Sequence, residues 1–123
     1  MPPSDLDNLT HRLRAFAKAR DWEQYHTPKN LAMALSVEVA ELVEHFQWLT
    51  PEEAGRLMGD PVARAAVTSE LADVTIYLIR LADVLGIDLA QAAKEKIEVN
   101  EVRFPAEEGA VRPVAESREG REP

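Results

Sequence analysis

The chain has 123 residues, a formal net charge of −8 at pH 7 and no cysteine. This length suits one compact domain, the charge disfavours a surface for a nucleic-acid polymer, and the lack of cysteine excludes disulfides. The first residues lack the features of a signal peptide, and charges interrupt every apolar run before it could span a membrane. We therefore expect a cytoplasmic protein that partners neither membranes nor nucleic-acid polymers.

Helical spacing of apolar residues dominates the sequence, and no segment competes as a strand. Thr27 and Asp60 can cap helices whose first residue is a proline, and Gly86 is placed to end a helix. The predicted helices span residues 4–20, 28–48, 51–58, 61–86 and 89–103. We predict an all-α fold, a helical bundle forming one domain over residues 1–105, followed by a polar tail over residues 106–123.

Two of the long helices each carry a pair of carboxylates one turn apart. Glu38 and Glu41 form one pair, and Glu70 and Asp73 form the other. On a helical wheel all four border the apolar stripe of their helix rather than its polar back. Such pairs are common as solvated surface charge. Because a carboxylate that leaves water requires a partner, their placement favours a site for Mg²⁺, an ion that prefers oxygen ligands, or for Mn²⁺ as its substitute.

Three polar residues share one face of the last predicted helix. Lys96, Asn100 and Arg103 follow one another at spacings of four and three residues. If this face is directed inward, its cations could neutralise the four acids through salt bridges. The alternative is that the three residues contact triphosphate oxygens and sugar, which would supply positive charge that the chain as a whole lacks.

Aromatic residues gather at the two ends of the second long helix. Trp22, Tyr25 and His26 lie in the connector before it, and Trp48 lies at its predicted end. Tryptophan is more often a core residue than a stacking partner. Here both tryptophans lie at helix ends near the acids, where a nucleobase could stack on them.

These features together closely resemble the MazG-like all-α nucleoside triphosphate pyrophosphohydrolases, most nearly the dCTP pyrophosphatase type. The resemblance covers residues 9–105 and rests on DWEQYHTPKNL, EVAELVEHFQW, ELADVTIYLIRLAD and KIEVNEVRFP. It implies Mg²⁺-dependent hydrolysis of (deoxy)nucleoside triphosphates, including dCTP or modified dCTP, to the monophosphate and pyrophosphate. It also implies a four-helix bundle completed by oligomerisation, as a homotetramer built from two dimers.

The resemblance assigns a role to each candidate residue. The four acids would bind the metal, and Glu41, in preference to Glu38, would orient or deprotonate the water that attacks the α-phosphorus. Lys96 and Arg103 would offset charge on the leaving group. The implied metal ligands are Glu38, Glu41, Glu70 and Asp73; the implied contacts to phosphate or sugar are Tyr77, Lys96, Asn100 and Arg103; those on the nucleoside side are Trp22, His26, Asn30 and Trp48.

Two positions depart from the family pattern. Leu13 stands where eukaryotic members of the dCTP type have histidine, and Lys29 replaces an arginine. Base preference is therefore not carried over from the resemblance. Two alternatives stay open: a related pyrophosphatase acting on dUTP or phosphoribosyl-ATP, and a non-catalytic helical protein that uses its acids for metal storage or partner docking.

Overall fold

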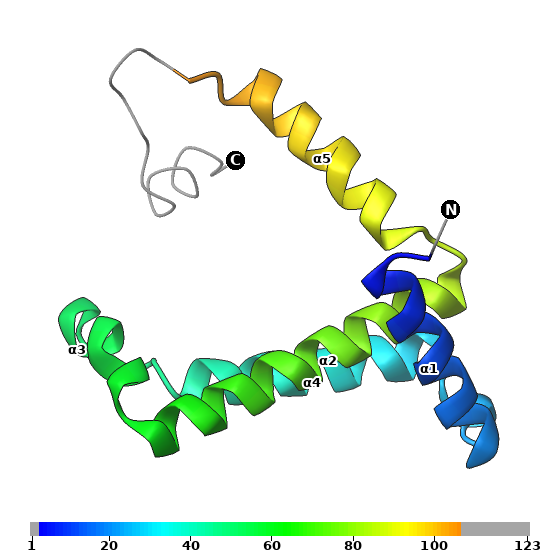
Figure 1. Cartoon of the computed structure of the whole chain (residues 1–123), viewed down its shortest axis with the longest axis horizontal. Helices are drawn as coiled ribbons and strands as arrows, with labels where there is room; N and C mark the ends of the chain where they lie inside the picture. Colours follow the sequence, from blue (N-terminus) through cyan, green and yellow to red (C-terminus); the bar gives the residue numbers. More distant parts are fainter. Residues whose placement is uncertain (1–2, 107–123) are drawn as a thin grey trace. The chain divides into compact units, whose positions relative to one another are not determined.

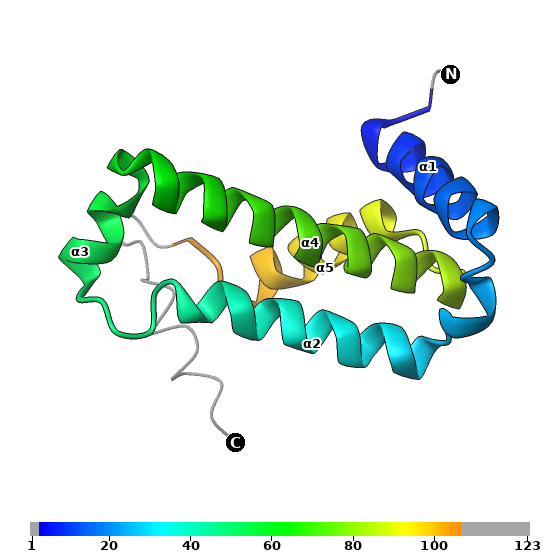
Figure 2. The ribbon, with the colours of Figure 1, turned by 90° about the horizontal axis from the view of Figure 1, so that it is seen from below.

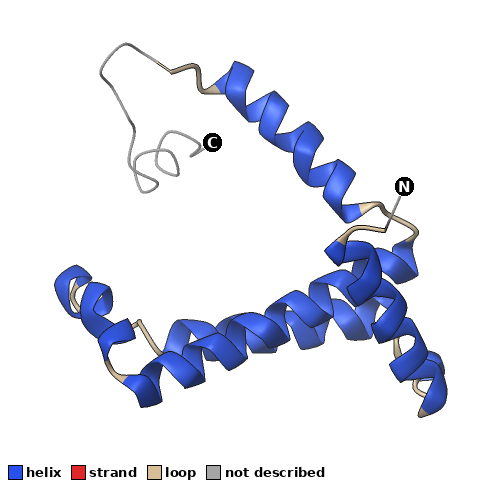
Figure 3. Ribbon diagram, viewed as in Figure 1, coloured by secondary structure: helices blue, strands red, loops and turns tan. Residues whose placement is uncertain are grey.

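The computed structural model describes residues 3–106, and within them it contains helices and no strand (Figures 1 and 3). The predicted all-α fold is confirmed. None of the helices in this range is long and apolar enough to cross a membrane. The elements are α1 (Asp5–Ala19), η1 (Glu23–Tyr25), α2 (Pro28–Glu44), α3 (Pro51–Arg56), η2 (Leu57–Gly59), α4 (Pro61–Leu85) and α5 (Leu89–Arg103).

The chain divides into two compact units, Met1–Leu89 and Ala90–Pro123. The first contains α1 to α4 and the second contains nearly all of α5. The predicted tail at residues 106–123 lies almost entirely outside the described residues, and the predicted domain boundary at residue 105 stays a prediction.

Helix N-termini form where the sequence places capping residues. The Ser4 hydroxyl accepts a hydrogen bond from the Asp7 N–H (3.1 Å), and the Asp7 carboxylate accepts one from the Ser4 N–H (3.2 Å). Thr50 and Glu53 form the same reciprocal capping box at α3, and Thr27 caps α2. Each box satisfies donors that have no partner within the helix, which fixes where the helix begins.

The predicted end of α2 at Trp48 is wrong, because the helix ends at Glu44. Within residues 45–49, three backbone N–H groups bind carbonyls three residues earlier at 2.9–3.2 Å, which tightens the chain into turns. Thr50 must be extended, since it precedes Pro51 and caps α3. The chain therefore leaves the α2 helix several residues before Thr50, and Trp48 is left 86% exposed.

The first unit is built on α2 and α4, which lie side by side and antiparallel (Figure 2). Helix α1 packs against α4. On α4, Leu78 is 39% exposed, whereas Ile79 and Ala82 are buried. These two border a cavity of about 210 Å³ together with residues of α1. The buried residues of α4 therefore include those next to α1, which packs against this helix as α2 does.

Gly86 ends α4 in the left-handed region, with φ of 70°. Its N–H donates to the Asp83 carbonyl (3.1 Å), and the N–H of Ile87 donates to the Ala82 carbonyl (2.9 Å), which together make a Schellman motif. No heavy atom lies within 4 Å of the position that a Cβ at Gly86 would occupy. The constraint on this residue is therefore its backbone conformation alone.

Replacing this glycine by alanine should destabilise the protein. Gly86→Ala is expected to lower the free energy of unfolding by about 1 kcal/mol, because an L-residue is disfavoured at positive φ. Gly55→Ala is the matched control: Gly55 lies inside α3, has open space around it, and should gain about 0.5–1 kcal/mol from helix propensity. Urea unfolding of both variants measures the two changes, and equal effects would contradict the argument.

Candidate functional site

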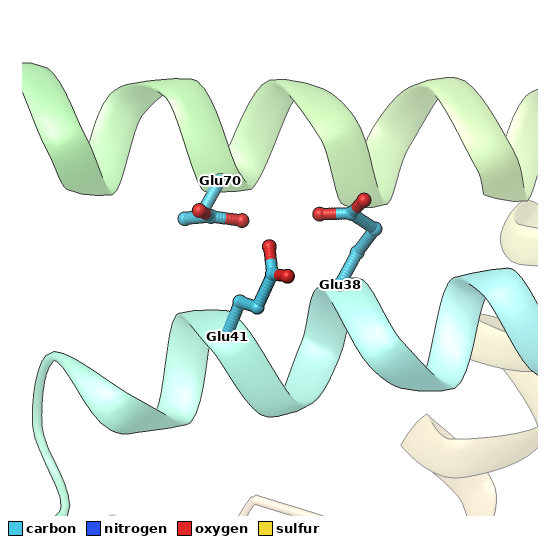
Figure 4. A group of neighbouring side chains, drawn as sticks. All are labelled: Glu38, Glu41 and Glu70. Carbon is cyan, nitrogen blue, oxygen red and sulfur yellow. The ribbon is translucent and has the colours of Figure 1, made fainter.

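Three glutamates converge between α2 and α4 (Figure 4). Helix α2 places Glu38 and Glu41 one turn apart on the side that faces α4, and Glu70 comes from α4. One carboxylate oxygen from each residue lies within 4.8 Å of the other two. All three residues are partly buried. The two predicted acidic pairs therefore meet, at least through these three members.

The cluster leaves buried oxygens without partners. Glu38 Oε2 and Glu70 Oε2 are inaccessible to solvent and have no hydrogen-bond partner in the structure. Burial, followed by contact with Glu41, raises the pKa of Glu38 to about 7. Burial and the charge of Glu41 also raise the pKa of Glu70. Like charges this close cannot all ionise favourably unless a proton or a cation separates them.

Asp73 lies near the cluster but outside the group of three. Its negative charge contributes to the raised pKa of both Glu38 and Glu70. Converging carboxylates with unpartnered buried oxygens are the donor set that a hard divalent cation prefers. The side chains present fit such a cation, and this group of acids could bind a metal ion.

A cavity of about 380 Å³ includes Asp73 in its lining. Most of its surface is apolar or aromatic and a few polar groups complete it, which is typical of a small-molecule site. The Trp22 ring meets Phe16 edge-on at 5.6 Å between centroids and meets His26 edge-on at 6.2 Å. The lining residues are Leu13 and Phe16 from α1, Trp22 and His26 from the connector, and Asp73, Ile76, Tyr77 and Arg80 from α4.

Trp22, His26, Asp73 and Tyr77 are thus four predicted site residues that line one cavity. Its lining also includes Leu13, where the sequence departs from the family pattern. Asp73 connects the cavity to the carboxylate cluster, because it lines the first and acts electrostatically on the second. The structure therefore brings an aromatic cavity and an acidic cluster next to each other.

Arg80 belongs to the site but was not predicted from the sequence. It is only 7% exposed, its Nε donates to His26 Nδ1 (3.0 Å), and its Nη1 donates to Asp83 Oδ2 (3.0 Å). Arg14 donates to both oxygens of Asp83, at 2.6 and 3.1 Å. Hydrogen bonding from Arg14 lowers the pKa of Asp83. An arginine three residues before an aspartate in an apolar segment was the signal that could have indicated this ion pair.

Other predicted residues lie elsewhere. The exposed Asn30 donates from its side-chain amide to the Tyr25 carbonyl (3.0 Å). Trp48 and His26 flank opposite ends of α2, whose 17 residues span about 25 Å at 1.5 Å per residue. The same chain therefore does not bring Trp48 to the cavity. Lys96, Asn100 and Arg103 lie on α5 in the second unit, and their contacts with substrate stay predictions.

The chain that carries this cluster and cavity is similar to known proteins. The model of the MazG-like family matches residues 33–112. Human dCTP pyrophosphatase 1 is 45% identical over 105 residues, which are 85% of this chain and 62% of that protein. The bovine protein of the same name is 50% identical over 100 residues, which are 81% of this chain and 59% of that protein. The chain thus spans about three fifths of the length of these curated relatives.

The fold has a solved counterpart. The crystal structure of a pyrophosphatase from Archaeoglobus fulgidus is similar with a TM-score of 0.79 and 41% identity. The match covers 86% of this chain and 97% of that one. Sequence and structure comparisons therefore agree over most of the chain, and the family model alone matches more than half of it. This chain belongs to the MazG-like family.

Proposed function

We propose that this chain is a nucleoside triphosphate pyrophosphohydrolase that releases the monophosphate and pyrophosphate with the help of Mg²⁺. The observation that carries the proposal is the carboxylate cluster with two unpartnered buried oxygens beside an aromatic cavity. A cation-binding site suits the phosphates of a triphosphate, and an aromatic cavity suits its base. The names of the relatives, dCTP pyrophosphatase 1 and pyrophosphatase, support the same reaction.

The acidic residues would hold the metal. Glu38, Glu41 and Glu70 converge within reach of one ion, and Asp73 would bind from the cavity side. When bound, Mg²⁺ supplies positive charge against the triphosphate and lowers the pKa of a water molecule. Glu41 would orient that water or accept its proton. Mn²⁺ can take the same oxygen ligands and is the expected substitute.

The remaining residues would bind the two ends of the nucleotide. Lys96 and Arg103 would offset charge that develops on the leaving pyrophosphate, with Asn100 beside them on α5. Trp22 and His26 would contact the nucleoside from within the cavity, and Asn30 and Trp48 would complete this side. Tyr77, which also lines the cavity, would contact phosphate or sugar.

The substrate assignment begins with dCTP and base-modified dCTP. The proposed compartment is the cytoplasm, whose reducing conditions suit a chain without disulfides. A panel of deoxynucleoside and ribonucleoside triphosphates, with dUTP and phosphoribosyl-ATP included, should be assayed for pyrophosphate release with Mg²⁺. Turnover of one cytidine nucleotide above the others is the expected result. Turnover of dUTP or phosphoribosyl-ATP alone would show that the substrate belongs to one of these classes instead of the cytidine nucleotides. No turnover at all would leave the non-catalytic metal-binding protein as the better reading.

The proposal includes a homo-oligomer, expected as a dimer of dimers. Several large apolar side chains on α2 and α4 remain exposed in the single chain, which is more than a stable monomer of this size normally shows. They include Met33 at 59%, Val37 at 55% and Leu71 at 51% exposure. The exposed Trp48 adds to the argument, since another copy could bring this ring to the nucleoside.

A charged residue on this apolar surface should weaken assembly. Leu71→Lys is expected to shift the sedimentation mass toward that of a smaller species, because a buried lysine without a partner is costly at an interface. Asn8→Lys makes the same change in charge at an exposed polar position of α1 and should keep the wild-type mass. Sedimentation velocity at several protein concentrations measures both variants, and an unchanged mass for Leu71→Lys would exclude this surface as the interface.

A further inference from the structure

The contact between Arg80 and His26 determines where the histidine carries its proton. Arg80 Nε lies 3.0 Å from His26 Nδ1. A guanidinium keeps all its protons under physiological conditions and can only donate. Nδ1 must therefore accept, which is incompatible with a proton on that nitrogen. A neutral imidazole has one donor and one acceptor, so the proton of His26 lies on Nε2.

Arg80 is itself held in place from both sides. Its side chain is 8% exposed, and its Nη1 donates to Asp83, whose carboxylate is also bound through both oxygens by Arg14. This chain of contacts ties α1 and α4 to the connector that carries His26. A guanidinium fixed at one end by a buried ion pair presents its Nε in one direction. The histidine ring is consequently fixed in both orientation and tautomer.

The surroundings also keep His26 uncharged. Burial, followed by the positive charge of Arg80, lowers the pKa of the His26 imidazole. The ring lines the cavity together with Trp22 and Tyr77. With Nδ1 occupied by Arg80, Nε2 is the ring nitrogen left to meet a ligand. It meets that ligand as a neutral donor.

We infer that Arg80 is a positioning residue: it holds His26 in the Nε2–H tautomer, so that the cavity offers the nucleoside one fixed hydrogen-bond donor. The matching ligand group is an acceptor, such as a base carbonyl oxygen or an unprotonated ring nitrogen. An exocyclic amino group is a donor and would be rejected at this point. This assignment of the ligand rests on the proposed function, whereas the tautomer of His26 does not.

The rival explanation is that Arg80 serves only the ion pair with Asp83. Two substitutions separate the explanations, because side chains of equal length differ in which contact they keep. In Arg80→Gln the amide nitrogen is attached at the same position as the arginine Nε, so a donor to His26 remains available while the charge and the contact with Asp83 are lost. In Arg80→Met a methyl group takes that position, so the donor and the charge are both lost.

The decisive experiment is ¹⁵N NMR of the histidine side chains in the full chain without nucleotide or metal. In the wild type, His26 should show Nδ1 in the range of an unprotonated ring nitrogen and Nε2 in the range of a protonated one. Arg80→Gln should keep this pattern, and Arg80→Met should shift His26 to mixed tautomers. A wild-type His26 protonated on Nδ1, or equal patterns in both variants, would overturn the inference. If Arg80→Met fails to fold, the wild-type spectrum still tests the inference, because a His26 protonated on Nδ1 overturns it.

Steady-state kinetics then test the consequence for substrate. Arg80→Met should raise KM by about fivefold, the loss expected for one neutral hydrogen bond, while kcat stays within about twofold. Arg80→Gln should stay near the wild-type KM. Should the NMR pattern hold while no nucleotide is turned over, the proposed function fails and the positioning role stands. If nucleotides are turned over but the wild-type His26 is protonated on Nδ1, the positioning role fails and the proposed function stands.

Discussion

Glu38→Gln is expected to remove nearly all pyrophosphate release, lowering kcat/KM by at least about 100-fold. Substituting a residue that only hydrogen-bonds to a metal ligand typically lowers metal affinity or activity by about 10- to 100-fold. Substituting a ligand itself should lower activity by at least the upper value. Glutamine keeps the size of Glu38 but cannot supply the negative charge that a divalent cation requires. The measurement is the initial rate of pyrophosphate release across a range of Mg²⁺ and substrate concentrations.

The same helix provides the control for this experiment. Glu44 is an exposed residue at the end of α2, and Glu44→Gln makes an identical chemical change away from the cluster. Its activity should match the wild type. Asp73→Asn should lose activity to a similar degree as Glu38→Gln. Full activity in both Glu38→Gln and Asp73→Asn would remove the metal-site assignment, whatever the fate of the control.

The metal-free protein should become less stable as the pH rises from about 4.5 to about 7.5, between the unfolded and the folded pKa of Glu38. The pKa of Glu38 is raised to about 7 in the folded chain, and that of Glu70 is raised too. A carboxyl group whose pKa is higher in the folded than in the unfolded chain stabilises the folded state fully below its unfolded pKa. This stabilisation is lost as the pH rises through the folded pKa. Two groups have the opposite dependence. Asp83, whose pKa is lowered, already stabilises the folded chain fully above its unfolded pKa. His26, whose pKa is also lowered, adds stability with rising pH only up to its unfolded pKa of about 6.5.

Mg²⁺ should reverse this loss, because an ion that binds only the folded state stabilises it. The increase in Tm on adding Mg²⁺ should accordingly be larger at pH 8 than at pH 5.5. Glu38→Gln should show a flatter pH dependence in EDTA and a smaller response to Mg²⁺. Calorimetry in EDTA and in Mg²⁺ tests both points. A wild-type Tm in EDTA that rises steadily over this window would show that the cluster is not strained by its own charge.

The positions of most helices were predictable because their signals are local. Ser4, Thr27 and Thr50 cap helices through groups only a few residues away, and Gly86 ends α4 through its own backbone conformation. The end of α2 was not predictable from periodicity, since apolar spacing continues to Trp48. The extended backbone that the capping box of α3 requires at Thr50 ends the helix. A pattern of apolar residues does not contain this requirement.

The site was predictable where its chemistry shows as a pattern on one helix. Glu38 and Glu41 border an apolar stripe, which pointed to a role beyond surface charge, and their meeting with Glu70 followed from pairing the two acidic helices. The contact between Arg80 and His26 was not predictable by the same reasoning, because the two residues are 54 positions apart in the sequence. The contact depends on how the connector folds back onto α4, which no spacing within one segment reveals.

The antiparallel pairing of α2 and α4 also bears on which parts of the chain the proposed cation site needs. Glu38, Glu41 and Glu70 all lie within one helical hairpin, in which α2 and α4 are connected by the short α3 and η2 segments. Closing this hairpin costs less entropy than joining residues from the two ends of the chain, because loop-closure entropy grows with loop length. The three glutamates of the proposed cation site therefore need only this hairpin to meet, and neither α5 nor a second copy supplies any of them.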